Sequence, residues 1–324
     1  MSEPHLPSIA PGDEQGPLIT DAPTWFTRAI AVEPEVRSIE VEGVRVEYLR
    51  WGDVTKPGLL LVHGNGAHAR WWSFIAPFLA REYCVAAINI SGMGDSGWRE
   101  TYSLEVFAEE QMAVCEDAGF FRNEEPPIIV GHSFGGFVTI LTGALYGERL
   151  AGTVIVDSPV NPPERPGGPP AREFRHHRIY PTIDEAMARF RLAPPQPSEN
   201  KYIVDYIARH SLKPVEGGWT WKFDPAIWQR FNIGNMSERL AATRCRIAIM
   251  RGEFSVLLPA EIGDYMFGLL GRSAPVIEIP QARHHVMLDQ PLAFVSALRA
   301  LLADWDHSKP VRRTDFPKGS PFEV

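Results

Sequence analysis

The sequence predicts an α/β fold: a mostly parallel, doubly wound sheet of about eight strands, with a helical lid inserted into it. Three observations lead to this prediction. Runs that are apolar at every residue alternate with runs of helical periodicity, as expected for parallel strands covered on both faces. A Gly-x-Ser-x-Gly turn joins one such strand to a helix at residues 131–135. The alternation stops after residue 158 and resumes near residue 245.

Periodicity assigns the elements in order. Two alternating runs around Gly43, at 37–42 and 44–49, predict a hairpin with one face in solvent. Apolar runs predict buried strands at 58–62, 85–88, 128–130 and 152–156, and the sheet is expected to continue with strands at 245–250 and 276–279. Apolar residues at helical spacing predict helices at 104–115, 137–146 and 291–305, and three more at 183–192, 202–210 and 227–240.

These elements divide the chain into segments. The predicted segments are an N-terminal arm (1–34), the α/β core (35–158 and 244–306), the helical lid (159–243) and a C-terminal tail (307–324). The start of the arm is rich in proline, glycine and acids, which is typical of flexible chain. Within it, residues 25–30 predict a short amphipathic helix that lies on the body or on a partner subunit, and the second arrangement would make a homodimer.

Composition limits the classes of function. Hydrophobic residues make up 44% and charged residues 22% of the 324 residues, as in ordinary soluble proteins. A net charge of −8 argues against a nucleic-acid-binding surface. We expect neither a secretory signal nor a membrane span, because the N-terminus lacks an apolar core and no apolar run is long enough. The three cysteines have neither metal nor redox spacing, so we expect reduced core thiols and a cytoplasmic protein without metal or cofactor.

One glycine-rich stretch has two interpretations. Residues 92–97, Gly-Met-Gly-Asp-Ser-Gly, fit the Gly-x-Gly-x-x-Gly template of dinucleotide-binding sites. That template requires its last glycines to open a helix, whereas here four residues intervene before the next helical pattern. A structural loop at the edge of a pocket is therefore favoured over an NAD site.

The glycine-serine turn supplies a candidate nucleophile. Ser133 lies at a tight corner, and the amide of Phe134 and the positive end of the following helix can stabilise an oxyanion beside it. A serine needs a base, and in an open α/β sheet the base should follow a strand. Among the ten histidines, that rule leaves His63, His132 and the pair 284–285. His63 is expected to hold its loop and His132 to point away from the serine, so the base is one of the pair, and His284 is favoured.

Four motifs in order resemble the α/β-hydrolase fold superfamily, in the branch with serine nucleophiles and helical caps. They are His-Gly-Asn-Gly at 63–66, Gly-Met-Gly-Asp-Ser at 92–96, Gly-His-Ser-Phe-Gly-Gly at 131–136 and His-His-Val-Met-Leu-Asp-Gln-Pro at 284–291. The resemblance covers about residues 39–305. It implies that Ser133 is the nucleophile, that His284 is the base, and that the backbone amides of Asn65 and Phe134 form the oxyanion hole.

The chain departs from that family at the acid of the triad. Members most often carry an aspartate after the seventh strand, in a Gly-x-x-Asp setting, but Ser255 occupies that position here. Asp157, after the sixth strand, is the predicted replacement, because a minority of the family draws its acid from there. Glu253 is the alternative acid, and Ser255 is expected to support the acid as a hydrogen-bond donor.

The motifs predict a serine hydrolase that cleaves small or medium carboxylic esters, including aromatic or acidic ones, through an acyl-enzyme. Serine at the turn disfavours epoxide hydrolase and haloalkane dehalogenase chemistry, which uses a carboxylate nucleophile in this fold. A lactonase or a hydrolase of C–C bonds in ring-cleavage products would use the same triad. From another class, a non-catalytic ligand-binding protein of this fold is also consistent with the missing acid after strand seven.

Substrate contacts are predicted from aromatic and basic residues near the motifs. The tryptophans expected to line an acyl pocket are Trp71, Trp72, Trp98 and Trp221. A basic cluster at the start of the lid would bind a substrate carboxylate, as in a half-ester of a dicarboxylic acid, or would simply be solvated; its members are Arg172, Arg175, His176, His177 and Arg178.

Overall fold

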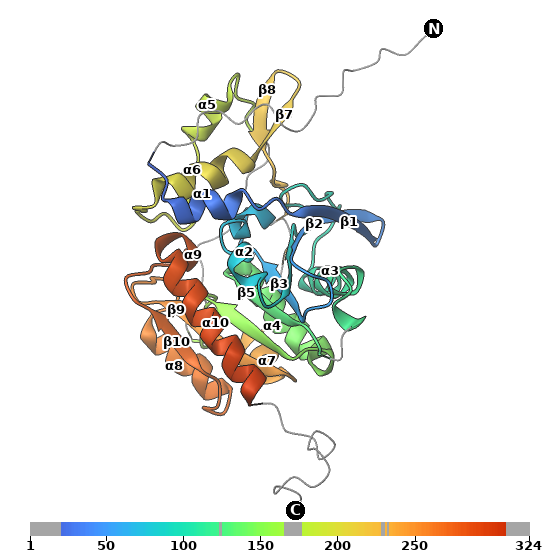
Figure 1. Cartoon of the computed structure of the whole chain (residues 1–324), viewed down its shortest axis with the longest axis vertical. Helices are drawn as coiled ribbons and strands as arrows, with labels where there is room; N and C mark the ends of the chain where they lie inside the picture. Colours follow the sequence, from blue (N-terminus) through green and yellow to red (C-terminus); the bar gives the residue numbers. More distant parts are fainter. Residues whose placement is uncertain (1–20, 123–124, 165–176, 228–230, 232, 309–324) are drawn as a thin grey trace, which may run out of the picture.

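Eight strands form the central sheet of the computed structural model, which describes residues 21–122, 125–164, 177–227, 231 and 233–308. The strands are β1 (Glu35–Val41), β2 (Val44–Trp51), β3 (Gly58–Val62), β4 (Cys84–Ile88), β5 (Ile128–His132), β6 (Gly152–Val156), β9 (Arg246–Gly252) and β10 (Val276–Ile279). Their spatial order is β1-β2-β4-β3-β5-β6-β9-β10 (Figure 1). Pairing is antiparallel from β1 to β4 and parallel from β4 to β10, which confirms the predicted fold class.

Helices cover both faces of the sheet. One face carries α2 (Ala76–Leu79), α9 (Val286–Asp289) and α10 (Pro291–His307); the other carries α3 (Leu104–Asp117), α4 (Phe134–Tyr146), α7 (Met236–Ala241) and α8 (Ala260–Leu269). Side chains of one strand alternate between these layers: in β3, Leu59 and Leu61 pack toward α10, and Leu60 and Val62 pack toward α3 and α4. Burial on both faces explains why the inner strands β3 and β4 contain only apolar residues and glycine.

The chain order places a functional site at one edge. After β3, the chain places β4 on one side of β3 and then β5, β6, β9 and β10 on its other side. The direction in which strands are added therefore reverses between β3 and β5. Ligands of open α/β sheets bind at such a switch point, beyond the carboxyl ends of the strands. The turn with Ser133 follows β5 at this edge.

The segment inserted between β6 and β9 differs in part from prediction. It contains α5 (Ile183–Met187), α6 (Lys201–His210), a hairpin of β7 (Leu212–Val215) and β8 (Gly218–Trp221), and α7. In Figure 1, α5, α6 and the hairpin gather at one end of the molecule, whereas α7 packs beside α4 and α8 nearer the other end. We call residues 159–243 the inserted segment.

Three helix and strand predictions for this segment need correction. The helix predicted at 183–192 ends at Met187, with Ala188 as its C-cap. The helix predicted at 227–240 is α7 alone, and residues 228–230 and 232 lie outside the described residues. The hairpin was not predicted; its turn uses Gly217 and Gly218, both at positive φ, where glycine is strongly favoured. In the core, α8 was also not predicted.

The predicted amphipathic helix exists as α1 (Thr24–Ile30) and lies on its own chain, next to α6 (Figure 1). Phe26 is 2% exposed, and its ring centroid lies 4.9 Å from that of Tyr202 and 5.8 Å from those of Tyr206 and Phe74. The helix thus joins the inserted segment to the core. The homodimer stays a prediction, and residues 1–20 and 309–324 of the predicted arm and tail lie outside the described residues.

Two further expectations concern bilayers and thiols. Among the described helices, none combines the length and apolarity needed to cross a membrane. Cys84 and Cys115 are buried and Cys245 is half-buried, and all three are free thiols. Burial raises the pKa of Cys245 to about 11, so this thiol stays protonated at neutral pH.

Substitution of Phe26 tests the role of α1. Phe26→Ala should lower the free energy of unfolding by about 3 kcal/mol, because it leaves a cavity among aromatic rings. Urea denaturation followed by tryptophan fluorescence would measure this change. Val36→Ala is the control, since Val36 is 55% exposed and should change the free energy by less than about 0.5 kcal/mol. Equal effects of the two substitutions would contradict this role of α1.

Candidate active site

The turn between β5 and α4 is a crowded corner. Ser133 has φ 54° and ψ −120°, an unfavourable conformation for a residue with a side chain. A Cβ on Gly131 would lie 2.5 Å from the Gly135 carbonyl oxygen, and one on Gly135 would lie 2.4 Å from the His63 carbonyl oxygen. The Ser133 amide donates to the carbonyl of Val156 at 2.9 Å, which fixes the corner against β6. The two glycines are therefore required by space.

A chain of hydrogen bonds joins the three residues predicted to form the triad. His284 Nε2 lies 2.9 Å from Ser133 Oγ, and His284 Nδ1 lies 2.9 Å from Asp157 Oδ1. The imidazole and the carboxylate are almost completely buried. Ser133 follows β5, Asp157 follows β6 and His284 lies in the loop after β10, so all three sit at the carboxyl edge of the sheet. This is the geometry in which an imidazole can take a proton from a serine.

The carboxylate of Asp157 receives two further hydrogen bonds. Ser255 Oγ donates to Oδ1 at 2.5 Å, and the Gly252 amide donates to Oδ2 at 2.8 Å. Ser255 therefore occupies the supporting position expected for it. The alternative acid is directed elsewhere: Glu253 is exposed, and its Oε2 accepts from the Gln281 amide at 2.8 Å. The structure thus brings Asp157 to His284 and leaves Glu253 apart.

His132 has a role that the sequence reasoning missed. Its Nε2 donates to the carbonyl oxygen of His284 at 2.9 Å, so it positions the backbone of the candidate base. Burial holds the pKa of His132 well below its ordinary value, and the ring stays neutral at neutral pH. Its place inside the glycine-serine motif is the only sequence signal for this contact, and strand alternation suggested only that it points away from Ser133.

The loop after β3 packs against the serine. His63 accepts a hydrogen bond from the Ile90 amide at 3.2 Å through Nε2 and contacts the Gly64 carbonyl through Nδ1 at 2.8 Å, which holds the loop as predicted. A Cβ on Gly64 would lie 3.1 Å from Ser133 Cβ. Asn65, the residue after Gly64, lines the cavity above Ser133. Phe134 is the first residue of α4, at the positive end of the helix dipole.

The loop that carries His284 is held by a residue of the inserted segment. Gln196 Nε2 lies 3.0 Å from both carboxylate oxygens of Asp289, and Gln196 Oε1 accepts from the His285 amide at 3.1 Å. Asp289 Oδ2 also accepts from the Arg283 amide at 2.7 Å. Sequence reasoning did not identify Gln196, because nothing in residues 193–198 indicates which loop they meet.

A cavity of about 360 Å³ opens above Ser133, within the size range of small-molecule sites. It is lined by Gly64, Asn65, Gly66, Ala67, Trp71, His132, Ser133, Tyr180, Arg189, Phe190, Arg191, Leu192, Ala193, Ser211, Trp221, Phe223 and His285. Two of the four predicted tryptophans, Trp71 and Trp221, are among them. Trp72 is fully buried against Phe294, and Trp98 is 45% exposed with the ammonium of Lys213 4.8 Å from its ring centroid, so these two lie away from the cavity.

Only part of the predicted basic cluster can be placed. Arg172, Arg175 and His176 lie outside the described residues. The His177 ring contacts the carbonyl of Phe223 through Nε2, and the Arg178 guanidinium lies 5.6 Å from the ring centroid of Tyr180. Neither His177 nor Arg178 lines the cavity.

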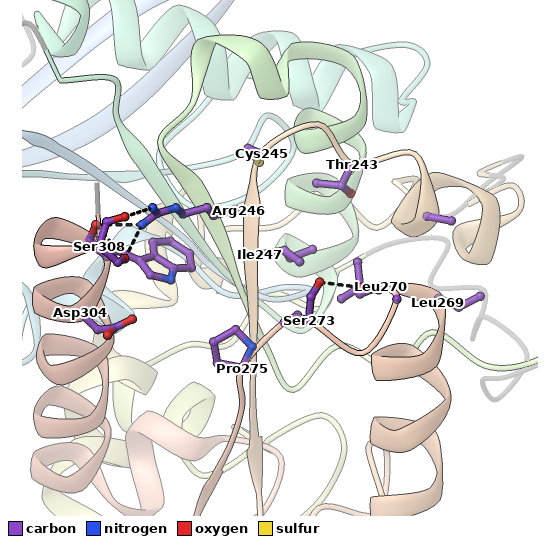
Figure 2. A pocket seen from close by; sticks show the side chains of 14 residues that line it. Thr243, Cys245, Arg246, Ile247, Leu269, Leu270, Ser273, Pro275, Asp304 and Ser308 are labelled. Atoms are coloured by element: carbon purple, nitrogen blue, oxygen red, sulfur yellow. Dashed lines mark hydrogen bonds between the residues drawn. The ribbon is translucent and has the colours of Figure 1, made fainter. Parts of the chain in front are cut away.

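A larger cavity, of about 590 Å³, lies at the other end of β9 (Figure 2). Arg246, the first residue of β9, donates from Nη1 to the Trp305 carbonyl at 2.8 Å and to Ser308 Oγ at 3.0 Å across this hollow. Its lining contains no histidine and no part of the hydrogen-bonded chain around Ser133. The smaller cavity is therefore the candidate active site.

Two ligand classes can be compared with these residues. Within the described part of the chain, one group has the composition of a metal site: His132, His284 and His285 each offer a nitrogen within 4.8 Å of the others. Both nitrogens of His284 already contact Asp157 and Ser133, so a metal here would break that chain of hydrogen bonds.

The second ligand class is the dinucleotide considered for residues 92–97. A Cβ on Gly94 would lie 2.1 Å from Asn89 Oδ1, so this glycine packs against a side chain of its own protein.

An open α/β sheet with a serine on a strand-to-helix corner is the arrangement found in a large class of hydrolases. A model of the alpha/beta hydrolase family matches residues 59–298, and the chain belongs to this family. This match establishes the family and its fold, whereas activity depends on the residues at the site.

Individual relatives are distant. The chain is 30% identical over 111 residues to Lipase LipV of Mycobacterium tuberculosis, an alignment that covers 34% of this chain and 41% of that protein. It is 25% identical over 269 residues to Monoacylglycerol lipase of Mycolicibacterium smegmatis, covering 78% and 89% of the two chains. Other relatives are named as epoxide hydrolases.

Among solved structures, that of E-2-(Acetamidomethylene)succinate Hydrolase superposes with a TM-score of 0.70. It is 20% identical, and the match covers 84% of this chain and all of that one. At this identity the likeness concerns the fold alone.

Replacement of the two candidate acids should give different results. Asp157→Asn should lower kcat by about 10³- to 10⁴-fold, because the amide cannot hold His284 in the tautomer that accepts the serine proton. Steady-state hydrolysis of an activated ester would measure it. Glu253→Gln is the matched control and should retain activity, because the amide oxygen can still accept from the Gln281 amide. Loss of activity in Glu253→Gln with an active Asp157→Asn would reverse the assignment.

Buried histidines make stability depend on pH. Burial lowers the pKa of His63 to about 4 from an ordinary value of 6.5. Between these values the unfolded chain binds a proton that the folded chain does not, so the free energy of unfolding falls as the pH is lowered from 6.5 to 4. The expected slope is at most about 1.4 kcal/mol per pH unit for this residue.

Urea titrations at several pH values would measure the slope. His63→Gln keeps an acceptor for the Ile90 amide but cannot titrate. The dependence of its free energy of unfolding on pH should therefore be weaker, by up to about 1.4 kcal/mol per pH unit. An unchanged slope in this variant would show that His63 does not contribute.

Proposed function

We propose that the protein is a serine hydrolase that cleaves carboxylic esters through an acyl-enzyme intermediate. The observation that carries this proposal is the continuous hydrogen-bonded chain from Asp157 through His284 to Ser133, at 2.9 Å for each step, below a cavity with aromatic side chains in its lining. A serine nucleophile suits acyl transfer, whereas epoxide opening in this fold employs a carboxylate. The lipase relatives are consistent with the proposal but do not establish a substrate.

The proposed reaction follows from the positions of these groups. Ser133 Oγ attacks the carbonyl carbon while its proton passes to His284 Nε2, and the backbone amides of Asn65 and Phe134 donate to the oxyanion. The imidazolium, stabilised by Asp157, returns the proton to the alkoxy oxygen as the C–O bond breaks and the alcohol leaves. Water then attacks the acyl-enzyme, with His284 first taking its proton and then returning it to Ser133.

The cavity favours small or medium substrates. Its volume of about 360 Å³ lies near the lower end of the range for small-molecule sites, and Trp71, Phe190 and Trp221 supply apolar surface for an aliphatic or aromatic group. Lactones and the C–C bonds of ring-cleavage products remain alternative substrates for the same triad. A ligand-binding protein without turnover is the alternative from another class.

Burst kinetics test this proposal. A panel of p-nitrophenyl esters of increasing acyl length should give a burst of p-nitrophenol stoichiometric with enzyme, because acylation releases the phenol before water cleaves the acyl-enzyme. Ser133→Ala should abolish both the burst and labelling by a fluorophosphonate. Stopped-flow absorbance and mass spectrometry of the labelled protein provide the two measurements.

The outcomes separate the alternatives. Labelling of Ser133 without turnover of any ester would contradict the esterase proposal and favour lactone or C–C substrates. Neither labelling nor turnover would favour ligand binding. Ester turnover that persists in Ser133→Ala would overturn the assignment of the nucleophile.

A further inference from the structure

The cavity above Ser133 has an uneven charge. Among its lining residues are two arginines, Arg189 and Arg191, and no aspartate or glutamate. This contrasts with the whole chain, which carries a net charge of −8. A ligand in this cavity therefore meets cationic groups and no acidic side chain in the lining.

Both guanidinium groups are available to a ligand. Other cations of the inserted segment pair with carboxylates: Arg209 Nε lies 2.9 Å from Asp205, and Lys222 Nζ lies 2.8 Å from Asp95. Within the described residues, no ion pair to a carboxylate involves Arg189 or Arg191.

Backbone contacts hold one of the two in place. Arg191 Nη1 donates to the carbonyl oxygens of Ala188 and Phe190, at 2.9 Å and 2.6 Å. These bonds keep the guanidinium beside the residues that follow α5, at the cavity, and leave its other nitrogens for an external acceptor. A partly fixed guanidinium loses less side-chain entropy when it binds a carboxylate.

We propose that Arg189 and Arg191 bind a carboxylate on the substrate, so that the enzyme hydrolyses esters that also carry a free carboxylate, such as half-esters of dicarboxylic acids. The planar guanidinium matches a carboxylate in two parallel hydrogen bonds. Trp71, Phe190 and Trp221 contact the hydrocarbon between the carboxylate and the ester that Ser133 attacks.

This assignment rests on the proposed esterase function and deepens it. It also places the anion site at Arg189 and Arg191, further along the inserted segment than the residues that the sequence suggested. The sequence suggested Arg175 and Arg178, but Arg175 lies outside the described residues and Arg178 contacts the Tyr180 ring rather than the cavity.

A pair of isosteric esters tests the proposal. Mono-p-nitrophenyl glutarate and p-nitrophenyl valerate have acyl groups of equal length and differ in a terminal carboxylate or methyl group. The native protein should have at least about a tenfold higher kcat/KM for the glutarate ester, since one charged hydrogen-bonded pair accounts for a factor of this size. In Arg189→Gln/Arg191→Gln this preference should disappear, mainly through a higher KM for the glutarate ester.

Controls distinguish recognition from damage to the fold. Arg178→Gln removes a nearby arginine that does not line the cavity, and it should leave the glutarate preference intact. Addition of salt should weaken the preference in the native protein, because exposed charges are screened. An equal loss of kcat/KM for both esters in the double variant, or a native protein without preference, would overturn the proposal. Loss of preference in Arg178→Gln would place the anion site elsewhere.

A binding measurement separates this inference from the esterase proposal. Calorimetry with monomethyl glutarate and Ser133→Ala reports on the arginines without any turnover. Binding that weakens at least about tenfold in the Ser133→Ala, Arg189→Gln, Arg191→Gln variant supports the anion site, even if no ester is hydrolysed. Valerate turnover with no binding of the half-ester would retain the esterase and refute the anion site.

Discussion

The close contact of three backbone segments at the β5–α4 corner is the constraint on which the rest of the site depends. Gly131 and Gly135 leave room for the chain to turn, and Ser133 between them adopts φ 54°. This conformation costs on the order of 1–3 kcal/mol and is maintained by the covered sheet around it. In return, Ser133 Oγ is directed out of the sheet, to within 2.9 Å of His284.

The second constraint is the exchange of acid and serine between neighbouring strands. Asp157 follows β6 and Ser255 follows β9, and their side chains meet at 2.5 Å. A carboxylate on either strand could reach His284, because adjacent parallel strands end at the same edge. Here the acid follows β6, and Ser255, at the position after β9 where the family usually has its acid, donates a hydrogen bond to it. The carboxylate therefore has hydrogen-bond donors although it lies on the neighbouring strand.

Much of this could be predicted from the sequence, for identifiable physical reasons. Uniformly apolar strands are buried on both faces, so their positions and parallel pairing followed from pattern alone. The glycine-serine corner and the strand-end rule led to Ser133 and to a pair of histidines of which His284 was favoured, and the family resemblance supported His284 and added Asp157. The contacts of Gln196, Ser255 and His132 depend on which loops meet in space. Ser255 had a signal in the family pattern, His132 had only its place in the glycine-serine motif, and Gln196 had none.

The inserted segment was predicted least well. Its helices are short, and its hairpin depends on two glycines rather than on an apolar pattern. Trp72 was assigned to a pocket from its type and its neighbours, although its ring is enclosed in the core beside Phe294. Aromatic residues serve both packing and binding, and only the three-dimensional arrangement distinguishes these uses.

Gln196 gives the inserted segment an energetic connection to the candidate base. It binds the carboxylate of Asp289 and the amide of His285, so displacement of this part of the segment removes hydrogen bonds from the loop that carries His284. This coupling is reciprocal: the packed segment favours the ordered loop by the same free energy by which the ordered loop favours the packed segment. A ligand that contacts Phe190 and Trp221 on this segment would thereby increase the fraction of molecules in which the imidazole is aligned with the serine.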